Sequence, residues 1–527
     1  YEYKLASKEK RREPFMEYHL RTEVLQGTEV VFDGCQEQPV DLTLSLPDYC
    51  PDIQRILKCQ IYPCITSKSI VGDSLEVNGN TMLRILYVDS VGLPIRCCEK
   101  ISTFTTNIPM KKTLDNPIAF VKAKVEYVNC RATSPRKLDI HGAFSVCAKV
   151  LEHVPQDILC DIEGDDIQQM KSEIEASNIA GMTQEAFSVS EVLEISSGKQ
   201  AAETIIRSDC SITMDDMKVL DNKLILQGEV IVKILYSSGM GETLPEHMEY
   251  TIPYSQMIDC AGVTEQCMCD VRVEAMGADV QIKTDSAGEN MLFEAEVRAM
   301  AHVTAYMNER FTVVTDAYST EHNLNLEYKQ HTLHKLVEII KDSDVQKNNF
   351  EVDDIGISQV IDVWNEMKSV TASIDEGNIV YSGKYNVCIL AMGSEGKPFY
   401  FERMVDFKCS HDWSNTSDSM KCDAMVHIKS MNYRITGNSG IEVKVELSLT
   451  AAILQEFSYK AIIAASTDEE HPVLKDSKAA LIIYYAEAGE SLWNIARQYY
   501  TSVNAIKEEN DLSDDNVVSK GMLFIPV

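Results

Sequence analysis

Basic residues and long apolar runs are both scarce in this sequence. Lys and Arg together number 49 against 81 Asp and Glu, which gives a formal net charge of -32. This balance repels nucleic-acid phosphates and anionic lipid surfaces, so we expect neither as a general partner. The chain contains no apolar run of about 18 residues, and its opening residues lack the apolar stretch of a secretory signal. We therefore expect a soluble, cytosolic protein with no transmembrane segment.

Motifs for catalysis and metal binding are also missing. The sequence has no phosphate-binding loop, no dinucleotide-binding loop, no His-Glu-x-x-His and no Gly-x-Ser-x-Gly. Cys97-Cys98 and Cys267-Met268-Cys269 are spaced too closely for a zinc-binding pair. We therefore predict no catalytic residue, no metal site and no cofactor, and we expect a protein that is not an enzyme.

The 16 cysteines are unevenly distributed along the chain. Nine of them lie between Cys35 and Cys160, and none follows Cys422. A secreted scaffold held by disulfides would carry its cysteines in every unit. The uneven distribution therefore predicts reduced, mostly buried thiols in a cytosolic protein.

The 527 residues suffice for three to four domains, and the sequence repeats internally. An alternating apolar segment with a central glycine occurs three times, around Gly79, Gly228 and Gly383, at intervals of about 150 residues. A second apolar block keeps nearly the same interval, at Val125, Val273 and Ile428. Two independent blocks at one spacing indicate three copies of one domain.

The periodicity of the repeated segment indicates its secondary structure. Apolar residues alternate with polar ones from Leu75 to Tyr87, which predicts a long strand with one buried face. The shared glycine predicts a bulge, a bend or a close backbone approach. A turn cluster and a second strand follow each copy, as in a β-hairpin. We therefore predict three antiparallel β domains, each a sandwich or open barrel, with short helices around residues 52–57 and 167–176.

The C-terminal residues follow a different pattern. A polar stretch at 466–479 predicts a linker. A short strand, a helix that begins after Ser491, a second helix from Thr501 and a closing strand follow in the order β-α-α-β. The predicted fold class is thus multidomain and mainly β, with a small α+β module at the C-terminus. The predicted divisions are a basic flexible arm (1–14), three β repeats (15–163, 164–328 and 329–465), a linker (466–479) and the small module (480–527).

The C-terminal module resembles a LysM module. The resemblance lies in residues 485–496 (Tyr-Ala-Glu-Ala-Gly-Glu-Ser-Leu-Trp-Asn-Ile-Ala), 499–503 and 521–526. It implies a groove that binds N-acetylglucosamine glycans such as peptidoglycan. This chain departs from the common LysM pattern in having Ala488, Glu490, Tyr500 and Lys520. A groove for a glycan or for a protein partner is implied at Gly489, Glu490, Ser491, Leu492, Asn510, Asp511, Leu512 and Ser513.

The three long repeats resemble the SPOCS domain of clostridial sporulation proteins. The resemblance lies in the segment 46–53 (Leu-Pro-Asp-Tyr-Cys-Pro-Asp-Ile), the lead-in at 23–28, and the glycine-centred strand of all three copies. Two prolines in segment 46–53 favour a turn that leads into a short helix. The alternative is a partner-binding segment at Leu46, Pro47 and Asp48.

SPOCS repeats followed by one LysM module are typical of spore-coat morphogenetic proteins. This resemblance implies a scaffold in the mother-cell cytoplasm that binds a coat morphogenetic ATPase and helps anchor the coat to the forespore surface. The alternative function is a peptidoglycan-binding protein that uses the LysM groove, with the repeats as a spacer.

Overall fold

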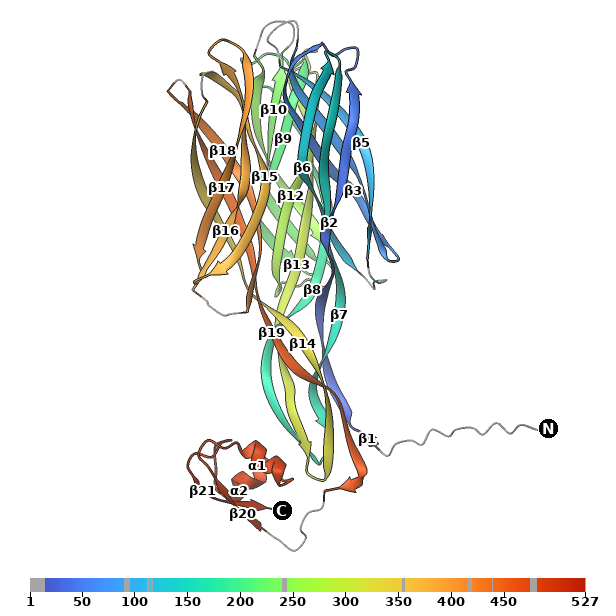
Figure 1. The fold of residues 1–527 in the computed structure, drawn as a ribbon, viewed down its shortest axis with the longest axis vertical. Helices are drawn as coiled ribbons and strands as arrows, with labels where there is room; N and C mark the ends of the chain where they lie inside the picture. The colour runs from blue at the N-terminus through green and yellow to red at the C-terminus, as the bar shows by residue number, and fades with distance from the viewer. Residues whose placement is uncertain are drawn as a thin grey trace, which may run out of the picture.

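Three β sandwiches, a stalk and a small terminal module make up the molecule (Figure 1). The computed structural model describes residues 15–89, 95–110, 114, 117–238, 244–352, 356–414, 419–437, 439–473 and 481–526. The sandwiches lie side by side at one end, and the small module lies at the far end of the stalk. The predicted fold class is confirmed. The predicted basic arm lies outside the described residues.

Each repeat contributes six strands in the same order. The strands of the first repeat are β2 (His19–Ser45), β3 (Ile53–Val71), β4 (Ser74–Asp89), β5 (Ile95–Pro109), β6 (Ile118–Ser134) and β7 (Lys137–Glu163). Those of the second are β8 (Ile167–Glu194), β9 (Thr204–Leu220), β10 (Lys223–Ser237), β11 (Glu246–Asp259), β12 (Met268–Lys283) and β13 (Leu292–Ser319). Those of the third are β14 (His322–Glu351), β15 (Ile357–Asp375), β16 (Asn378–Gly393), β17 (Pro398–Asp412), β18 (Met420–Thr436) and β19 (Gly440–Pro472).

The six strands of a repeat form two antiparallel sheets. In the first repeat the orders are β2-β7-β6 and β3-β4-β5. The second repeat has β8-β13-β12 and β9-β10-β11, and the third has β14-β19-β18 and β15-β16-β17. Apolar side chains between the two sheets build a separate core in each repeat. The identical topology shows that the third repeat is the same domain as the first two.

Several predicted elements and boundaries are wrong. The short helices expected at 52–57 and 167–176 are absent, because these residues enter strands β3 and β8 and form long-range ladders. Strand β14 begins at His322, so the second repeat ends before residue 328. Strand β19 continues through Pro472, so 466–472 belong to the third repeat and not to a linker. Residues 474–479 of that linker lie outside the described residues.

The shared glycine of each central strand marks a close backbone approach. A Cβ added at Gly79 would lie 2.5 Å from the Cys64 carbonyl oxygen, and one at Gly228 would lie 2.0 Å from that of Thr213. In both strand pairs the register shifts next to the glycine. Only glycine fits between the two backbones at such a bulge.

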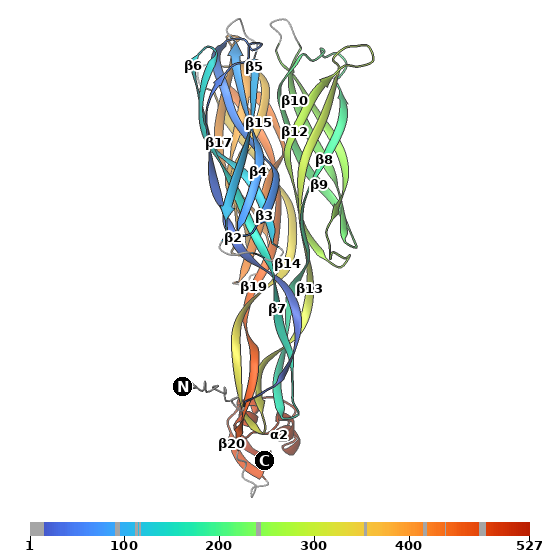
Figure 2. The same ribbon diagram turned by 90° about the vertical axis from the view of Figure 1, so that its right-hand side faces the viewer.

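The stalk is built from the longest strands. The pairs β2–β7, β8–β13 and β14–β19 continue below the sandwiches as three two-stranded ribbons that twist around one another (Figure 2). Side chains from all three ribbons meet in two apolar clusters. The upper cluster has Leu25, Ile158, Ala176, Phe311, Val313 and Leu333; the lower has Tyr18, Leu159, Ile162, Ile167, Val314, Ala317, Ile462 and Ala465. A ribbon of two strands is at best marginally stable by itself, so the stalk requires all three repeats.

A short N-terminal strand closes the stalk. Strand β1 (Phe15–Glu17) does not join the first repeat but pairs antiparallel with β19 of the third. The first and last repeats are thereby joined through backbone hydrogen bonds as well as through side chains.

The three sandwiches meet on an axis with equivalent residues. Leu86, Leu235 and Leu390 lie at matching positions of β4, β10 and β16 and share one apolar cluster. Their register partners on the neighbouring strands are Lys58, Arg207 and Asp362. The apolar position is therefore kept in all three copies, whereas the position opposite carries charges of both signs.

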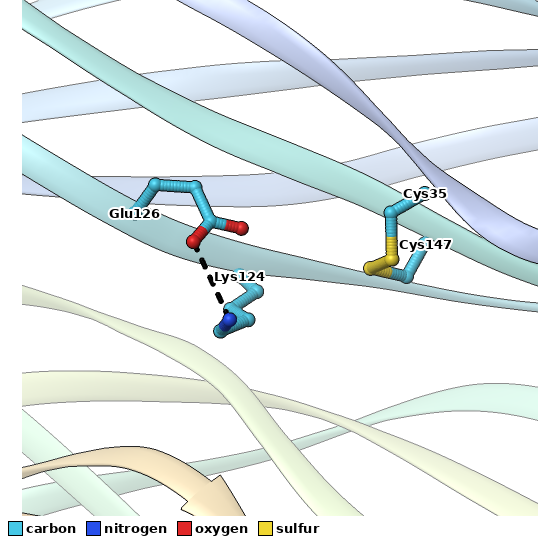
Figure 3. Close-up of a disulfide and its surroundings, with 4 residues drawn as sticks. All are labelled: Cys35, Lys124, Glu126 and Cys147. Atoms are coloured by element: carbon cyan, nitrogen blue, oxygen red, sulfur yellow. Dashed lines mark hydrogen bonds and ion pairs between the residues drawn. A yellow bond between two sulfur atoms is a disulfide. The ribbon is translucent and has the colours of Figure 1, made fainter.

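One disulfide contradicts the prediction of reduced thiols throughout. Cys35 of β2 and Cys147 of β7 are register partners and are joined at an S–S distance of 2.01 Å (Figure 3). The other 14 cysteines are free and either buried or half-buried. The pair is 112 residues apart in sequence. Its proximity arises only when the first and last strands of the repeat pair, so cysteine spacing could not reveal it.

Candidate functional sites

The LysM module has the predicted order of elements. Strands β20 (Leu481–Ala486) and β21 (Gly521–Pro526) pair antiparallel, and helices α1 (Leu492–Gln498) and α2 (Val503–Glu509) lie between them. Its buried core includes Leu492, Ile495, Ala496, Ile506, Leu523 and Ile525. Ser502 caps α2 by accepting a hydrogen bond from the Ala505 amide, whereas the Ser491 side chain makes no cap bond to α1.

The first predicted groove loop is held by bonds within the module. Gly489 has φ +88°, which glycine adopts without strain, and its amide donates to the Val517 carbonyl. The Glu490 carboxylate accepts from the Tyr484 hydroxyl at 2.6 Å and from the Glu487 amide at 3.0 Å. The Tyr484 bond holds the pKa of Glu490 below its ordinary value. Leu492 is fully buried, so its side chain stabilises the loop from beneath.

The second predicted groove loop is anchored by an asparagine. The Asn510 side chain donates to the carbonyls of Ile506 and Phe524 at 2.7 and 2.6 Å, and accepts from the Phe524 amide at 2.7 Å. Its amide group is therefore occupied in joining α2 to β21. Of the following residues, Leu512 is half-buried, and Asp511 and Ser513 are exposed.

A segment that sequence reasoning did not include lies beside the first loop. The Leu492 amide donates to the Asp515 carbonyl at 3.0 Å, and the Val517 amide donates to the Glu490 carbonyl at 2.9 Å. Ser491 and Asn516 form an isolated antiparallel bridge. Residues 515–517 directly follow the second loop, so these bonds bring the two predicted loops to one part of the module. No apolar period or motif marks the segment in the sequence.

The module is docked on the end of the stalk. The Trp493 indole donates to Asp316 at 2.9 Å, the Tyr318 hydroxyl donates to the Thr501 carbonyl at 2.7 Å, and Arg497 pairs with Asp316. The rings of Trp493 and Tyr318 meet edge to face with centroids 4.8 Å apart. Burial raises the pKa of Tyr318, whose hydroxyl therefore stays protonated.

The docking face is separate from the predicted groove bonds. The stalk contacts come from one half-buried flank of α1 and from the turn before α2. Glu490, Leu492 and Asn510 instead bond within the module. Trp493 packs both against the core of its own module and against Tyr318 of the second repeat.

The segment Leu46, Pro47 and Asp48 is a turn at the head of the first repeat. Leu46 is buried, Pro47 is half-buried and Asp48 is exposed. Arg136 holds the turn by donating to the carbonyls of Pro47 and Cys50 at 2.9 and 3.0 Å. The exposed part of the segment is therefore small, and its role as a partner-binding segment remains a prediction.

One cluster of metal-ligating atoms occurs in the described residues, at Glu366, Cys388 and Glu402. The Lys58 ammonium lies 2.5 Å from Glu402 and 3.6 Å from Glu366. Burial raises the pKa of Cys388 to about 12, so its thiol is protonated at neutral pH. The cluster is therefore an internal ion-pair site that already holds a cation from the first repeat.

Family comparisons agree with the architecture. The family model described as SipL, SPOCS domain, matches residues 52–133 and 201–283, in the first and second repeats. A LysM domain model matches residues 484–526. No curated protein and no solved structure matches the chain.

These matches show which domains the chain carries. The chain carries SPOCS domains and a C-terminal LysM domain. This is the domain combination of a SPOCS and LysM spore-coat protein, and it fits a role in sporulation. Neither helix among the described residues has the length and apolar character needed to cross a membrane.

Proposed function

We propose that the protein is a non-enzymatic scaffold of spore-coat assembly, which binds a coat morphogenetic ATPase at the forespore surface in the mother cell. The observation that carries the proposal is the fusion of three SPOCS-type sandwiches into one body with a LysM module docked at its far end. Extended strands rise about 3.3 Å per residue, so the 30 residues of β14 span roughly 100 Å. Such a body holds the sandwiches and the LysM module at a fixed distance from each other, as an adaptor between two partners requires.

An exposed apolar face on the LysM module supports a protein partner. Ile483, Tyr485 and Met522 are 54%, 75% and 47% exposed, and Tyr485 and Met522 are register partners across β20 and β21. Exposed apolar patches of this kind are typical of protein–protein contacts. The occupied side chains of Glu490 and Asn510 also leave fewer polar groups for sugar hydroxyls.

The proposal is tested by measuring binding of the full chain to the purified coat ATPase. We expect Tyr485→Ser together with Ile483→Ser to weaken binding at least about tenfold, because truncating a central interface residue commonly costs more than 1 kcal/mol. Val71→Ser serves as the matched control, since Val71 is equally exposed on a sandwich. No binding by the wild-type chain would refute the adaptor role.

The alternative function is peptidoglycan binding through the LysM groove, and the LysM match itself favours it. Calorimetry of the full chain with N-acetylglucosamine oligomers and muropeptides distinguishes the two functions. Saturable heat that is lost in Asp511→Ala with Ser513→Ala would support the glycan-binding function. Absence of any binding heat at millimolar sugar, with ATPase binding intact, would support the scaffold function.

A further inference from the structure

A cavity of about 840 Å³ lies between the three sandwiches. Its walls come mainly from matching strands of all three repeats, namely β3 and β6, β9 and β12, and β15 and β18. Neighbouring strands add one or two residues each, such as Asn386 of β16. This volume falls within the range of small-molecule sites. The cavity exists only because three copies pack around one axis.

Buried polar atoms without a hydrogen-bond partner in the protein gather on this cavity. They include Gln60 Oε1, Arg207 Nε, Trp364 Nε1 and Asn386 Oδ1, all from lining side chains that are more than nine-tenths buried. Both ring nitrogens of His427, another lining residue, are also without a partner. Buried polar groups are nearly always satisfied, because each unpaired one costs about 1–3 kcal/mol. The concentration of such atoms in one cavity therefore points to an occupant.

All charged residues of the cavity wall but one are held in ion pairs. The exception is Glu274, which makes none of the ion pairs among the described residues and whose pKa is raised by burial. Arg207 bonds to Asp362 and Asp209, and Lys58 bonds to Glu366 and Glu402. The other lining cations also have carboxylate partners: Lys124 with Glu126, Lys233 with Glu249, Lys368 with Glu366, and Lys429 with Glu446. An anionic ligand would have to break one of these pairs, and the raised pKa of Glu274 disfavours the carboxylate with which a cationic ligand would pair. The groups left to bind an occupant include amides, an indole, an imidazole, the Tyr62 hydroxyl and the Glu274 carboxyl, together with one N–H of Arg207.

We propose that this cavity binds a small, uncharged polyhydroxylated molecule, of the polyol or monosaccharide class. The unpaired atoms are donors at Trp364 and Arg207 and acceptors at Gln60 and Asn386. A hydroxyl group both donates and accepts, so several hydroxyls on one small molecule satisfy this mixed set without introducing charge. The site is formed by side chains of the three repeats and shares no residue with the predicted LysM groove.

Trp364 provides the readout, because its indole lies in the cavity wall. We would titrate the full-length protein with myo-inositol and with glucose and follow tryptophan fluorescence. A saturable change at millimolar ligand or below is expected, and Trp364→Phe should abolish it, since Trp413 and Trp493 lie outside the cavity wall. Asn386→Leu and Gln60→Leu should weaken the apparent affinity at least about tenfold, because each removes an acceptor that the ligand satisfies.

Melting curves provide a second measurement if a variant fluoresces abnormally. Polyols are excluded from protein surfaces and therefore raise the Tm of any protein without saturation. Specific binding is instead indicated by a saturable rise in Tm, which wild type should show and Asn386→Leu should lack. Equal, unsaturable stabilisation of both proteins would overturn the proposal. So would a crystal structure grown with myo-inositol in which the cavity holds ordered water alone, or saturation by a charged phosphate ester in place of the polyols.

Discussion

The stalk and the head join the same three repeats in different ways. In the stalk, the ribbons meet through apolar side chains such as Leu25, Ile158 and Phe311. In the head, one apolar layer around Leu235 is accompanied by buried ion pairs and a polar cavity. Each sandwich has its own core, so contacts between sandwiches can be polar without loss of the fold. A two-stranded ribbon has no core of its own, and its partners must supply one.

The polar contacts of the head distinguish three otherwise equivalent copies. Lys58, Arg207 and Asp362 occupy matching positions, and the Arg207–Asp362 contact measures 2.6 Å. Three identical residues there would place like charges around one axis. The difference in charge therefore favours closure of one chain on itself over assembly of repeats from separate chains.

The largest effect is expected in the stalk. Leu25→Asp places an unpaired charge in the upper apolar cluster and should lower the free energy of unfolding by more than about 4 kcal/mol. Denaturant unfolding of the full chain measures it. Val24→Asp is the matched control, because the adjacent Val24 side chain is half exposed. An equal loss of unfolding free energy in both variants would mean that the ribbons do not pack as described.

A smaller loss is expected when one partner of the head ion pair is removed. Asp362→Ala leaves buried Arg207 with Asp209 alone and should cost about 3 kcal/mol. The double variant Arg207→Met with Asp362→Leu should recover most of this loss, because no buried charge then lacks a partner. Chemical denaturation of both variants checks this, and failure of the double variant to recover would show that the pair contributes net stability.

The contact between the first two repeats should respond to pH through His302 of β13, whose ring centroid lies 5.7 Å from that of Phe120 in β6. Burial, with Lys68, Arg272 and Lys122 adding to it, lowers the pKa of His302 from 6.5 to about 4. The folded protein therefore binds fewer protons than the unfolded chain between these values, and stability falls as the pH drops from 6.5 towards 4. The expected loss is roughly 1–3 kcal/mol.

Comparison with a variant isolates the histidine. Wild type and His302→Gln would be unfolded by denaturant at several pH values between 7 and 4. The variant should lose less stability than wild type over this range. Parallel curves for the two proteins would assign the pH dependence to other groups.

The smallest effect concerns docking of the LysM module. Asp316→Ala removes the acceptor of Trp493 and the partner of Arg497, at a cost of about 1 kcal/mol because Arg497 is partly exposed. Trp493 fluorescence should shift towards that of solvent-exposed indole, while the melting of the sandwiches stays unchanged. Glu321→Ala is the control: this exposed residue lies in the turn between β13 and β14, and its replacement should change neither signal.

Sequence periodicity predicted the local parts of the fold well. The glycine-centred strand, the three copies and the β-α-α-β module all depend on residues close together in the chain, and all are present. The prediction of helices at 52–57 and 167–176 was wrong because their conformation depends on residues far away in the chain. In a short segment the spacing of apolar residues leaves helix and strand undecided, and here pairing with β4 and β13 decided for strands.

For the candidate sites too, features set by neighbouring residues were predicted and long-range contacts were not. The two LysM loops were located from local motifs, and the structure shows that Asn510 and Glu490 stabilise them. The contribution of residues 515–517 and the docking of Trp493 on Asp316 involve no local pattern. The polar tail of β19 was taken for a linker because its side chains are hydrophilic, yet its backbone pairs with β1 and β14.

The sequence by itself therefore determined the repeating unit, its buried faces and the identity of the C-terminal module. Alternation of polar and apolar residues selects a half-buried strand whatever its neighbours are. Only the tertiary structure decided the stalk, the Cys35–Cys147 bond, the charged contacts of the head and the cavity between the sandwiches. These features join side chains from strands more than 100 residues apart. Their positions follow from the packing of three whole repeats around one axis.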